Sequence, residues 1–175
     1  MNLLPRPLLI QGSFIIRPVL VWFMKGDRFV DPIDGQGYYS LLPYGYEKQR
    51  DNVLSPGTFS LERHRLMWLY LKNETTFFSR KAKVLHIAPE QSFIKRFRAM
   101  PNLEYITSDL ESPLADVKAD ICDLPFGDDT FDLVFCNHVL EHIPDDHKAM
   151  SELFRVMKPG GWGILQVPIS YQREV

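Results

Sequence analysis

Asp109 is the first side chain of this sequence whose position suggests chemistry. It directly follows the predicted strand 105–108, about half a βαβ unit beyond an earlier strand-like segment at 84–88. A carboxylate at that point of an open parallel sheet can accept hydrogen bonds from both hydroxyls of a nucleoside ribose. The alternative is a turn or helix cap, because Ser112 and Pro113 follow soon after. Position alone leaves both interpretations open.

A second group of residues would share one face of a helix. His138, Glu141 and His142 are spaced i, i+3 and i+4, and imidazole together with carboxylate can bind a divalent ion. A histidine in the first position suits a hard ion poorly, and the alternative is that Glu141 and His142 only cap and pack a turn. We therefore predict no bound metal. Either His142 or His138 could instead act as a general base.

The segment VLHIAPEQSFIKRF at 84–97 has the outline of a nucleotide-binding turn without the usual glycines. An apolar strand runs into Pro89, Glu90 and Gln91, and Phe93 and Phe97 then recur at helical spacing. Glycine lets the backbone approach a ligand without an intervening Cβ, so its replacement narrows a pocket. A cofactor site of altered shape and a buried strand-turn-helix both fit this pattern.

The elements that must position these groups alternate between strand and helix. Strands are predicted over 84–88, 105–108, 117–120, 131–136 and 162–168, and helices over 91–100 and 146–157. This alternation indicates βαβ units with right-handed crossovers. The predicted fold class is therefore α/β, a doubly wound and mostly parallel sheet of Rossmann-like type, in which ligands bind beyond the carboxyl ends of the strands.

Cap chemistry predicts two helix boundaries. Ser60 is a candidate N-cap for an amphipathic helix with Glu62 in its first turn. Lys158, followed by Pro159 and two glycines, should end the helix over 146–157.

Composition and charge exclude some classes of function. The chain has 175 residues, of which 45% are hydrophobic and 24% charged, as expected for a globular domain with a core. Its formal net charge is −2 and it has no long basic block, so nucleic acid is not an expected partner. A protein, a glycan or a small molecule is left open by the charge, and of these a small molecule or a glycan is the expected substrate. The two cysteines, Cys122 and Cys136, are too few for a disulfide framework, which indicates a cytoplasmic location.

The apolar segment LLIQGSFIIRPVLVWFMKG at 8–26 is interrupted by Arg17 and Pro18 before it reaches the roughly 18 to 20 residues that span a membrane. The arginine and the missing small-residue cleavage site also argue against a signal peptide. We expect one or two helices packed on the domain or on a partner. Peripheral contact with a membrane is the alternative.

Residues 1–59 are expected to form this apolar helix and an irregular, lid-like module, and residues 60–175 the main domain. The module has the spacing of a zinc ribbon with two CxxC pairs, but the four positions hold Asp31, Asp34, Ser55 and Thr58. Because no thiolate is present, a structural zinc is not expected.

Two motifs in order resemble a known family. The stretch DICDLPFGDDTFDLVFCNHVLEHIPDD at 120–146, followed by ELFRVMKPGGWGILQVP at 152–168, is similar to the class I S-adenosylmethionine-dependent methyltransferases, close to the type 11 group that modifies small molecules. The resemblance covers about 83–168, roughly half of the chain. It implies transfer of a methyl group from S-adenosyl-L-methionine to an acceptor by in-line attack.

The resemblance also implies a set of cofactor-binding residues. Asp109, with Leu110 beside it, would hold the ribose hydroxyls. Asp120 would bind the adenine amino group and Ile121 would pack on the adenine face. Asn137 would border the methionine part of the cofactor, and the turn 86–91 would lie under the carboxypropyl and ribose region.

The turn 86–91 departs from the family pattern, in which an acid precedes a glycine-rich run. His86 stands at the position of the acid, and Ala88, Pro89 and Glu90 replace the glycines. Ala88 is small enough to compensate in part. Glu90 or Glu141 could supply the carboxylate that normally meets the ammonium group of the ligand, and Gln91 completes the predicted site.

The family's fold continues after the fifth strand with a helix and an antiparallel hairpin, whereas this sequence ends at Val175. The strand over 162–168 would then be an exposed apolar edge, so we expect either a truncated fragment that could be inactive alone or a dimer across that edge. A non-catalytic scaffold of the same fold is the alternative function. A nicotinamide-dependent dehydrogenase is disfavoured because no GxGxxG follows the first strand.

Overall fold

A computed structural model of the chain describes residues 16–45 and 48–169. The chain consists of a first unit, Met1–Thr76, and a second unit, Phe77–Val175. The sequence predicts a boundary after residue 59. The structure places it after Thr76, so the helical segment 62–73 belongs to the first unit.

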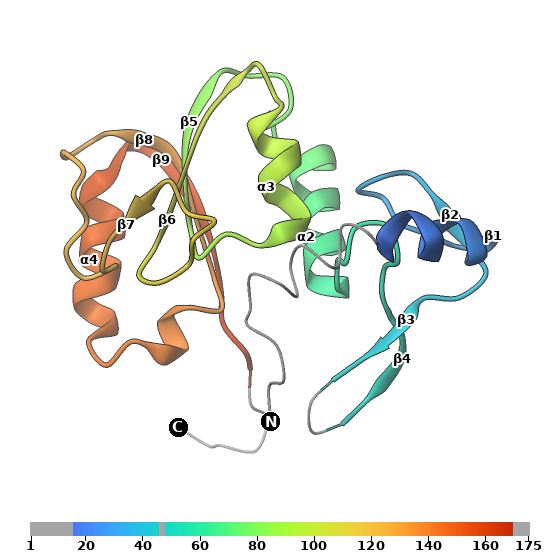
Figure 1. Cartoon of the computed structure of the whole chain (residues 1–175). Helices are drawn as coiled ribbons and strands as arrows, with labels where there is room; N and C mark the ends of the chain where they lie inside the picture. The colour runs from blue at the N-terminus through green and yellow to red at the C-terminus, as the bar shows by residue number, and fades with distance from the viewer. Residues whose placement is uncertain (1–15, 46–47, 170–175) are drawn as a thin grey trace. The chain divides into compact units, whose positions relative to one another are not determined.

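The second unit is built on a five-stranded parallel sheet with the strand order β7-β6-β5-β8-β9 (Figure 1). Its strands are β5 (Ala82–Ile87), β6 (Leu103–Asp109), β7 (Val117–Lys118), β8 (Phe131–Asn137) and β9 (Met157–Gln166). Helix α3 (Gln91–Arg98) connects β5 to β6, while the short 3₁₀ helix η1 (Leu140–His142) and helix α4 (Asp146–Val156) connect β8 to β9. The predicted fold class, a doubly wound parallel α/β sheet, is confirmed.

Different kinds of side chain cover the two faces of this sheet. On the α3 face, aromatic rings contact one another, and the ring centroid of Phe97 lies 5.0 Å from that of Phe77 and 5.5 Å from that of Tyr105. On the opposite face, aliphatic side chains of β5 and β8 pack against three residues of α4, which are Ala149, Leu153 and Val156. Figure 1 shows α3 and α4 on opposite sides of the strands. Burial on both faces explains the nearly continuous apolar sequence of β8.

Strand β9 begins earlier than the sequence predicts. Helix α4 ends at Val156, but the following Lys-Pro-Gly-Gly run belongs to β9. The register shifts there, because Met157 pairs with Phe131 whereas Trp162 pairs with Leu133. The left-handed glycine expected at a helix end, Gly160 with φ +79°, instead lies in this bulged part of the strand. Strand β9 forms one edge of the sheet, and pairing of two copies across that edge stays a prediction.

In residues 16–45 and 48–76, the first unit has two small antiparallel sheets and two helices. Strand β1 (Lys25–Val30) pairs with β2 (Gly37–Tyr38), and β3 (Leu42–Tyr44) pairs with β4 (Arg50–Leu54). Residues 16–23 are helical and precede β1, and helix α2 (Glu62–Asn73) follows β4. Within the two described ranges, no helix combines the length and the apolar character that crossing a bilayer requires.

The two loops with zinc-ribbon spacing share one backbone pattern. The N–H of Gly35 donates to the carbonyl of Asp31 at 2.8 Å, and that of Phe59 donates to the carbonyl of Ser55 at 2.9 Å. Both donors have positive φ, +71° at Gly35 and +53° at Phe59. The spacing seen in the sequence therefore corresponds to two similar turns.

Hydrogen bonds between oxygen atoms join these two loops. The carboxylate of Asp31 is buried and accepts from the hydroxyl of Thr58 at 2.5 Å and from that of Ser60 at 3.1 Å. The sequence predicted that Ser60 caps α2, and this prediction is wrong. The N-cap is Leu61, whose N–H donates to Nδ1 of His64 at 3.0 Å.

Candidate functional site

The strand order of the second unit reverses between β5 and β8. From β5 the chain crosses through α3 to β6 on one side, and from β8 it crosses through α4 to β9 on the other. Two residues with positive φ begin these diverging turns, Ala88 at +47° and His138 at +55°. The carboxyl ends of the strands at such a reversal are where open α/β sheets bind ligands.

Glu90 bridges the carboxyl ends of β5 and β8. Its Oε2 lies 2.7 Å from Nε2 of His86, the residue four positions earlier in β5. Its Oε1 accepts a hydrogen bond of 3.2 Å from Nδ2 of Asn137, the last residue of β8. The carboxylate is therefore held at the point where the strand order reverses.

The side chain of His86 is fully buried among the aromatic rings of the α3 face. Its Nδ1 lies 2.7 Å from the hydroxyl of Tyr105. Burial and the charge of Glu90 raise the pKa of Tyr105, so the phenol stays protonated and can donate to Nδ1. The Nε2–H of the ring then points to Glu90. The side chain of His86 therefore holds Glu90 in place, and its predicted contact with the cofactor stays a prediction.

Asp109 ends β6, the strand beside β5, and its side chain has two different environments. Oδ1 accepts hydrogen bonds from the backbone N–H groups of Glu111 at 2.8 Å and of Ser112 at 2.7 Å. Oδ2 accepts no hydrogen bond within residues 16–45 and 48–169. The turn-cap and ligand-binding interpretations of Asp109 are therefore compatible, because one oxygen atom caps the turn and the other is available.

Asp120 and Ile121 follow β7 on the far side of Asp109. The N–H of Ala119 donates to the carbonyl of Asp109 at 3.2 Å, which places the ends of β6 and β7 side by side. The exposed Asp120 accepts from the N–H of Cys122 at 2.8 Å, and Ile121 is buried in the aliphatic core. Leu110, with 56% of its surface exposed, and Gln91, at the exposed start of α3, lie at the same edge.

Helix α4 anchors the loop that carries Asp120 and Ile121. The carboxylate of Glu152 accepts from the N–H of Leu124 at 2.8 Å and from the guanidinium of Arg155 at 2.7 Å. Arg155 also donates to the carbonyls of Leu124 at 3.0 Å and Phe126 at 2.8 Å. Nothing in the sequence pattern identified Glu152 and Arg155, because their partners lie about 30 residues away in the chain.

We expect the stability contributed by Glu152 to depend on pH. Its hydrogen bonds to Arg155 lower its pKa from 4.5 to about 2, against the opposing effect of burial. A carboxyl with a lower pKa in the folded state stabilises above its ordinary pKa, and that contribution is lost as the pH falls toward 2. Solvent screens this surface pair, so the effect is modest.

The measurement is the urea midpoint of wild type and of Glu152→Gln across this pH range. The difference should be largest above pH 4.5 and shrink as the pH falls toward 2. Asp146→Asn, on the exposed first turn of the same helix, is the control and should show no such loss. A midpoint difference that does not change with pH would contradict the role of the carboxylate charge.

His138, Glu141 and His142 do not share a helical face, which their spacing would give only if the segment were helical. The left-handed conformation of His138 prevents helix there, and only the 3₁₀ turn η1 follows it. Nδ1 of His138 lies 3.3 Å from the carboxylate of Glu141, while His142 is exposed to solvent. In the part of the chain that the structure describes, no three acidic, histidine or cysteine side chains are arranged to hold a metal ion.

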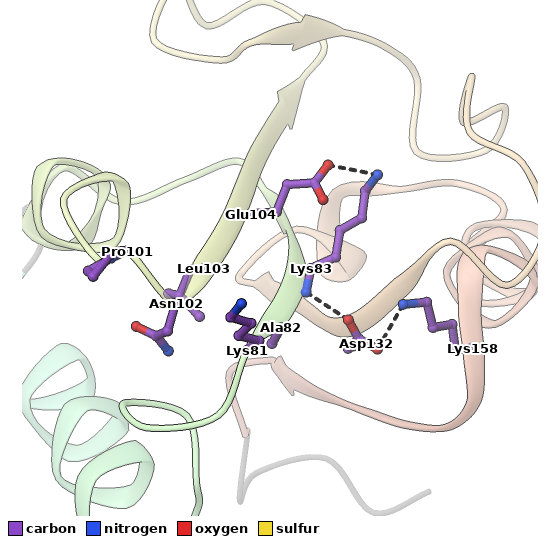
Figure 2. Close-up of a pocket in the computed structure, with 9 residues that line it drawn as sticks. All are labelled: Lys81, Ala82, Lys83, Pro101, Asn102, Leu103, Glu104, Asp132 and Lys158. Atoms are coloured by element: carbon purple, nitrogen blue, oxygen red, sulfur yellow. Dashed lines mark hydrogen bonds and ion pairs between the residues drawn. The ribbon is translucent and has the colours of Figure 1, made fainter.

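A cavity of about 420 Å³ lies at the opposite, amino edge of the sheet (Figure 2). Asp132 accepts there from the N–H of Lys83 at 2.7 Å and from Nζ of Lys158 at 2.9 Å, and Nζ of Lys83 pairs with Glu104 at 2.8 Å. The two carboxylates of the cavity, Asp132 and Glu104, are thus already neutralised by lysines. The polar groups that follow the strand ends lie at the other edge, and we place the candidate site there.

Comparisons with known proteins agree with this topology. A family model described as a methyltransferase domain matches residues 74–165. A demethylmenaquinone methyltransferase of Clavibacter sepedonicus is 49% identical over 45 residues, which are 26% of this chain and 18% of that protein. The sterol 4-C-methyltransferase strm-1 of Caenorhabditis elegans is 33% identical over 84 residues, which are 48% of this chain and 23% of that protein. The chain thus covers about a fifth of the length of these relatives.

A solved structure with a similar fold is phosphoethanolamine N-methyltransferase 2 of Haemonchus contortus, in complex with S-adenosyl-L-methionine. It is 21% identical, the match covers 59% of this chain and 27% of that protein, and the TM-score is 0.46. The strand order and the family model, rather than this modest similarity, carry the assignment.

Proposed function

Because the chain belongs to the family of class I S-adenosylmethionine-dependent methyltransferase domains, we propose that it binds S-adenosyl-L-methionine at the carboxyl edge of its sheet and transfers the methyl group to a small-molecule acceptor. The observation that carries this proposal is the position of Glu90, which bridges β5 and β8 where the strand order reverses. A ligand at that reversal meets carboxylates from successive strand ends, as suits a cofactor that bears a sulfonium and an ammonium group.

The chain's own residues match the separate parts of this cofactor. Oδ2 of Asp109 would accept from the ribose hydroxyls while Oδ1 keeps the turn closed. Asp120 would receive the adenine amino group, with Ile121 behind it. Glu90 would pair with the ammonium group and so take the role of the acid that His86 replaces. Ala88 would bring the backbone close to the ligand despite the missing glycines.

The bound cofactor supplies a methyl group on a positively charged sulfur, which an acceptor can attack directly. The contribution of the protein is to hold the two reactants in line, and alignment of this kind can supply about 7 to 11 kcal/mol of the barrier. His138 and His142 are the groups at this edge that could take a proton from an acceptor. Burial, with the charges of Glu141 and Glu90 nearby, raises the pKa of Cys136 to about 12, so its thiol stays protonated and is not a nucleophile.

A lipophilic small molecule is the acceptor that we propose. The similar proteins from Clavibacter sepedonicus and Caenorhabditis elegans are named for demethylmenaquinone and for a sterol, both of which are small apolar molecules. The net charge of −2 fits such an acceptor better than a nucleic acid.

Calorimetric titration of the purified chain with S-adenosylhomocysteine, the product form of the cofactor, tests the proposal. We expect one site with a dissociation constant of roughly micromolar order. NAD serves as the control and should release no binding heat, since the turn after β5 lacks the glycines that a pyrophosphate needs. A folded chain that gives no heat with S-adenosylhomocysteine would refute the cofactor site and favour the non-catalytic scaffold.

A further prediction concerns Glu90 and the amino-acid part of the cofactor. Glu90→Gln should weaken binding of S-adenosylhomocysteine about 10-fold or more, because a charge-assisted hydrogen bond to the ammonium group is lost. Binding of 5′-methylthioadenosine, which lacks that group, should change little. Comparing both ligands by calorimetry separates a local contact from a general loss of the site. Equal weakening of the two would show that Glu90 acts only on the fold of the site.

A further inference from the structure

The helical residues 16–23 of the first unit have one face against the protein. Met24, which follows this helix, is buried with Tyr38 and Leu41, and Val21 packs against the same cluster. The N–H of Met24 donates to the carbonyl of Leu20 at 2.9 Å and so continues the helix. The helix therefore packs on its own unit, and its expected packing on the main domain or on a partner stays a prediction.

The opposite face of the same helix is exposed, and it is also apolar. The exposed fractions are 55% for Ile16, 54% for Val19, 73% for Trp22 and 66% for Phe23. At 100° per residue, these four positions fall within one third of the helix circumference. The rings of Trp22 and Phe23 contact edge to face, with centroids 4.7 Å apart. The face is thus a continuous aliphatic and aromatic surface.

A helix on the surface of a water-soluble unit normally directs charged residues toward solvent. Large apolar side chains clustered on one exposed face instead mark a surface that contacts an apolar partner. Tryptophan and phenylalanine beside basic residues are typical of helices that lie in the boundary between lipid headgroups and acyl chains.

The charged residues near the helix indicate what kind of partner the exposed apolar face contacts. Residues 16–30 contain three basic side chains, Arg17, Lys25 and Arg28, and one acidic side chain, Asp27. Lys25 and Arg28 follow the helix on the exposed part of β1, and the guanidinium of Arg28 lies 5.3 Å from the ring centroid of Phe29. Local positive charge beside an apolar surface favours anionic lipid over neutral lipid or water.

We propose that the face formed by Ile16, Val19, Trp22 and Phe23 docks the protein onto the surface of an anionic lipid bilayer. The apolar side chains enter the headgroup region, and Lys25 and Arg28 pair with lipid phosphates. The contact is peripheral, because the helix lies along the membrane rather than across it. This inference is independent of the proposed methyl transfer, since the two sites belong to different units of the chain.

Co-sedimentation of the purified full chain with vesicles tests the proposal. We expect the protein to pellet with vesicles of phosphatidylcholine and phosphatidylglycerol, and much less with phosphatidylcholine alone. The double variant Trp22→Ala with Phe23→Ala should lower partitioning about 10-fold or more, because most of the inserted apolar area is removed. The variant Lys25→Gln with Arg28→Gln should weaken binding to anionic vesicles in low salt, and added salt should weaken wild type in the same way.

Leu66→Ala is the matched control, because this side chain of α2 is 66% exposed in the same unit. Its partitioning should equal that of wild type. Unchanged far-ultraviolet circular dichroism would confirm that the double variant is folded, and Val19→Ser provides a second, milder change on the same face. The proposal is overturned if wild type does not pellet with anionic vesicles, or if the double variant pellets equally well. The alternative occupant is a second copy of the chain. If wild type fails to bind vesicles and light scattering finds a dimer that the double variant abolishes, the face pairs two copies and the proposal is overturned.

Discussion

Asp109→Ala is expected to reduce the affinity for S-adenosylhomocysteine on the order of 100-fold or more. The variant removes the free Oδ2 that we assign to the two ribose hydroxyls, and hydrogen bonds to a charged acceptor are worth about 1.5 to 3 kcal/mol each. It also removes Oδ1, which accepts from the N–H groups of Glu111 and Ser112. Calorimetric titration of wild type and variant measures the combined loss.

The variant Asp109→Asn separates the two roles of this side chain. Its amide oxygen can keep the bonds to Glu111 and Ser112, so the turn should stay folded, while the charge that would face the ribose is gone. We expect an intermediate loss of affinity, about 10-fold. Asp123→Ala is the control, because this aspartate is exposed in the loop after β7 and should bind as wild type does. Wild-type affinity in Asp109→Ala would place the ribose elsewhere and contradict the site.

Phe97→Ala should lower the free energy of unfolding of the second unit by about 3 to 5 kcal/mol. Phe97 has no exposed surface, and its ring contacts those of Phe77, Tyr105 and Phe135. The variant leaves a cavity on the α3 face of the sheet, and this loss is a large share of the 5 to 15 kcal/mol that typically stabilises a domain. Urea unfolding followed by circular dichroism measures the change.

Two other variants show whether burial is the cause. Phe97→Leu retains most of the apolar volume and should cost clearly less than Phe97→Ala. Phe154→Ala removes the same number of atoms from a ring on α4 that is 76% exposed, so its unfolding midpoint should stay close to that of wild type. If Phe97→Ala unfolds at the same urea concentration as Phe154→Ala, the aromatic layer does not hold α3 on the sheet.

Chemical patterns in the sequence were sufficient to predict the elements of the second unit. The apolar run FDLVFCN predicted a strand buried on both faces, and β8 is confirmed at Phe131–Asn137. The helix end expected before Lys158 is confirmed, because α4 ends at Val156. The N-cap expected at Ser60 was wrong, because the N-cap of α2 is Leu61. Both Ser60 and Lys158 have distant partners that no local pattern shows. The hydroxyl of Ser60 donates to Asp31, and the ammonium of Lys158 pairs with Asp132.

The sequence by itself determined the class of the fold and the strand ends at which polar residues gather. The reason is that the periodicity of apolar residues and the turn chemistry are local properties, and alternating strands and helices leave few ways to form a parallel sheet. Asp109 and Asp120 could therefore be named from their places after strands.

Only the tertiary structure decided how those residues are used. The sequence named His86 and Glu90 as parts of one turn, but only packing buries the ring of His86 and holds the carboxylate of Glu90 between it and Asn137, a residue 47 positions away. In the same way, the apolar pattern of residues 16–23 could not show which face would pack on Met24, Tyr38 and Leu41. Burial and long-range hydrogen bonds depend on which segments meet in space, and a linear pattern of residue types does not contain that information.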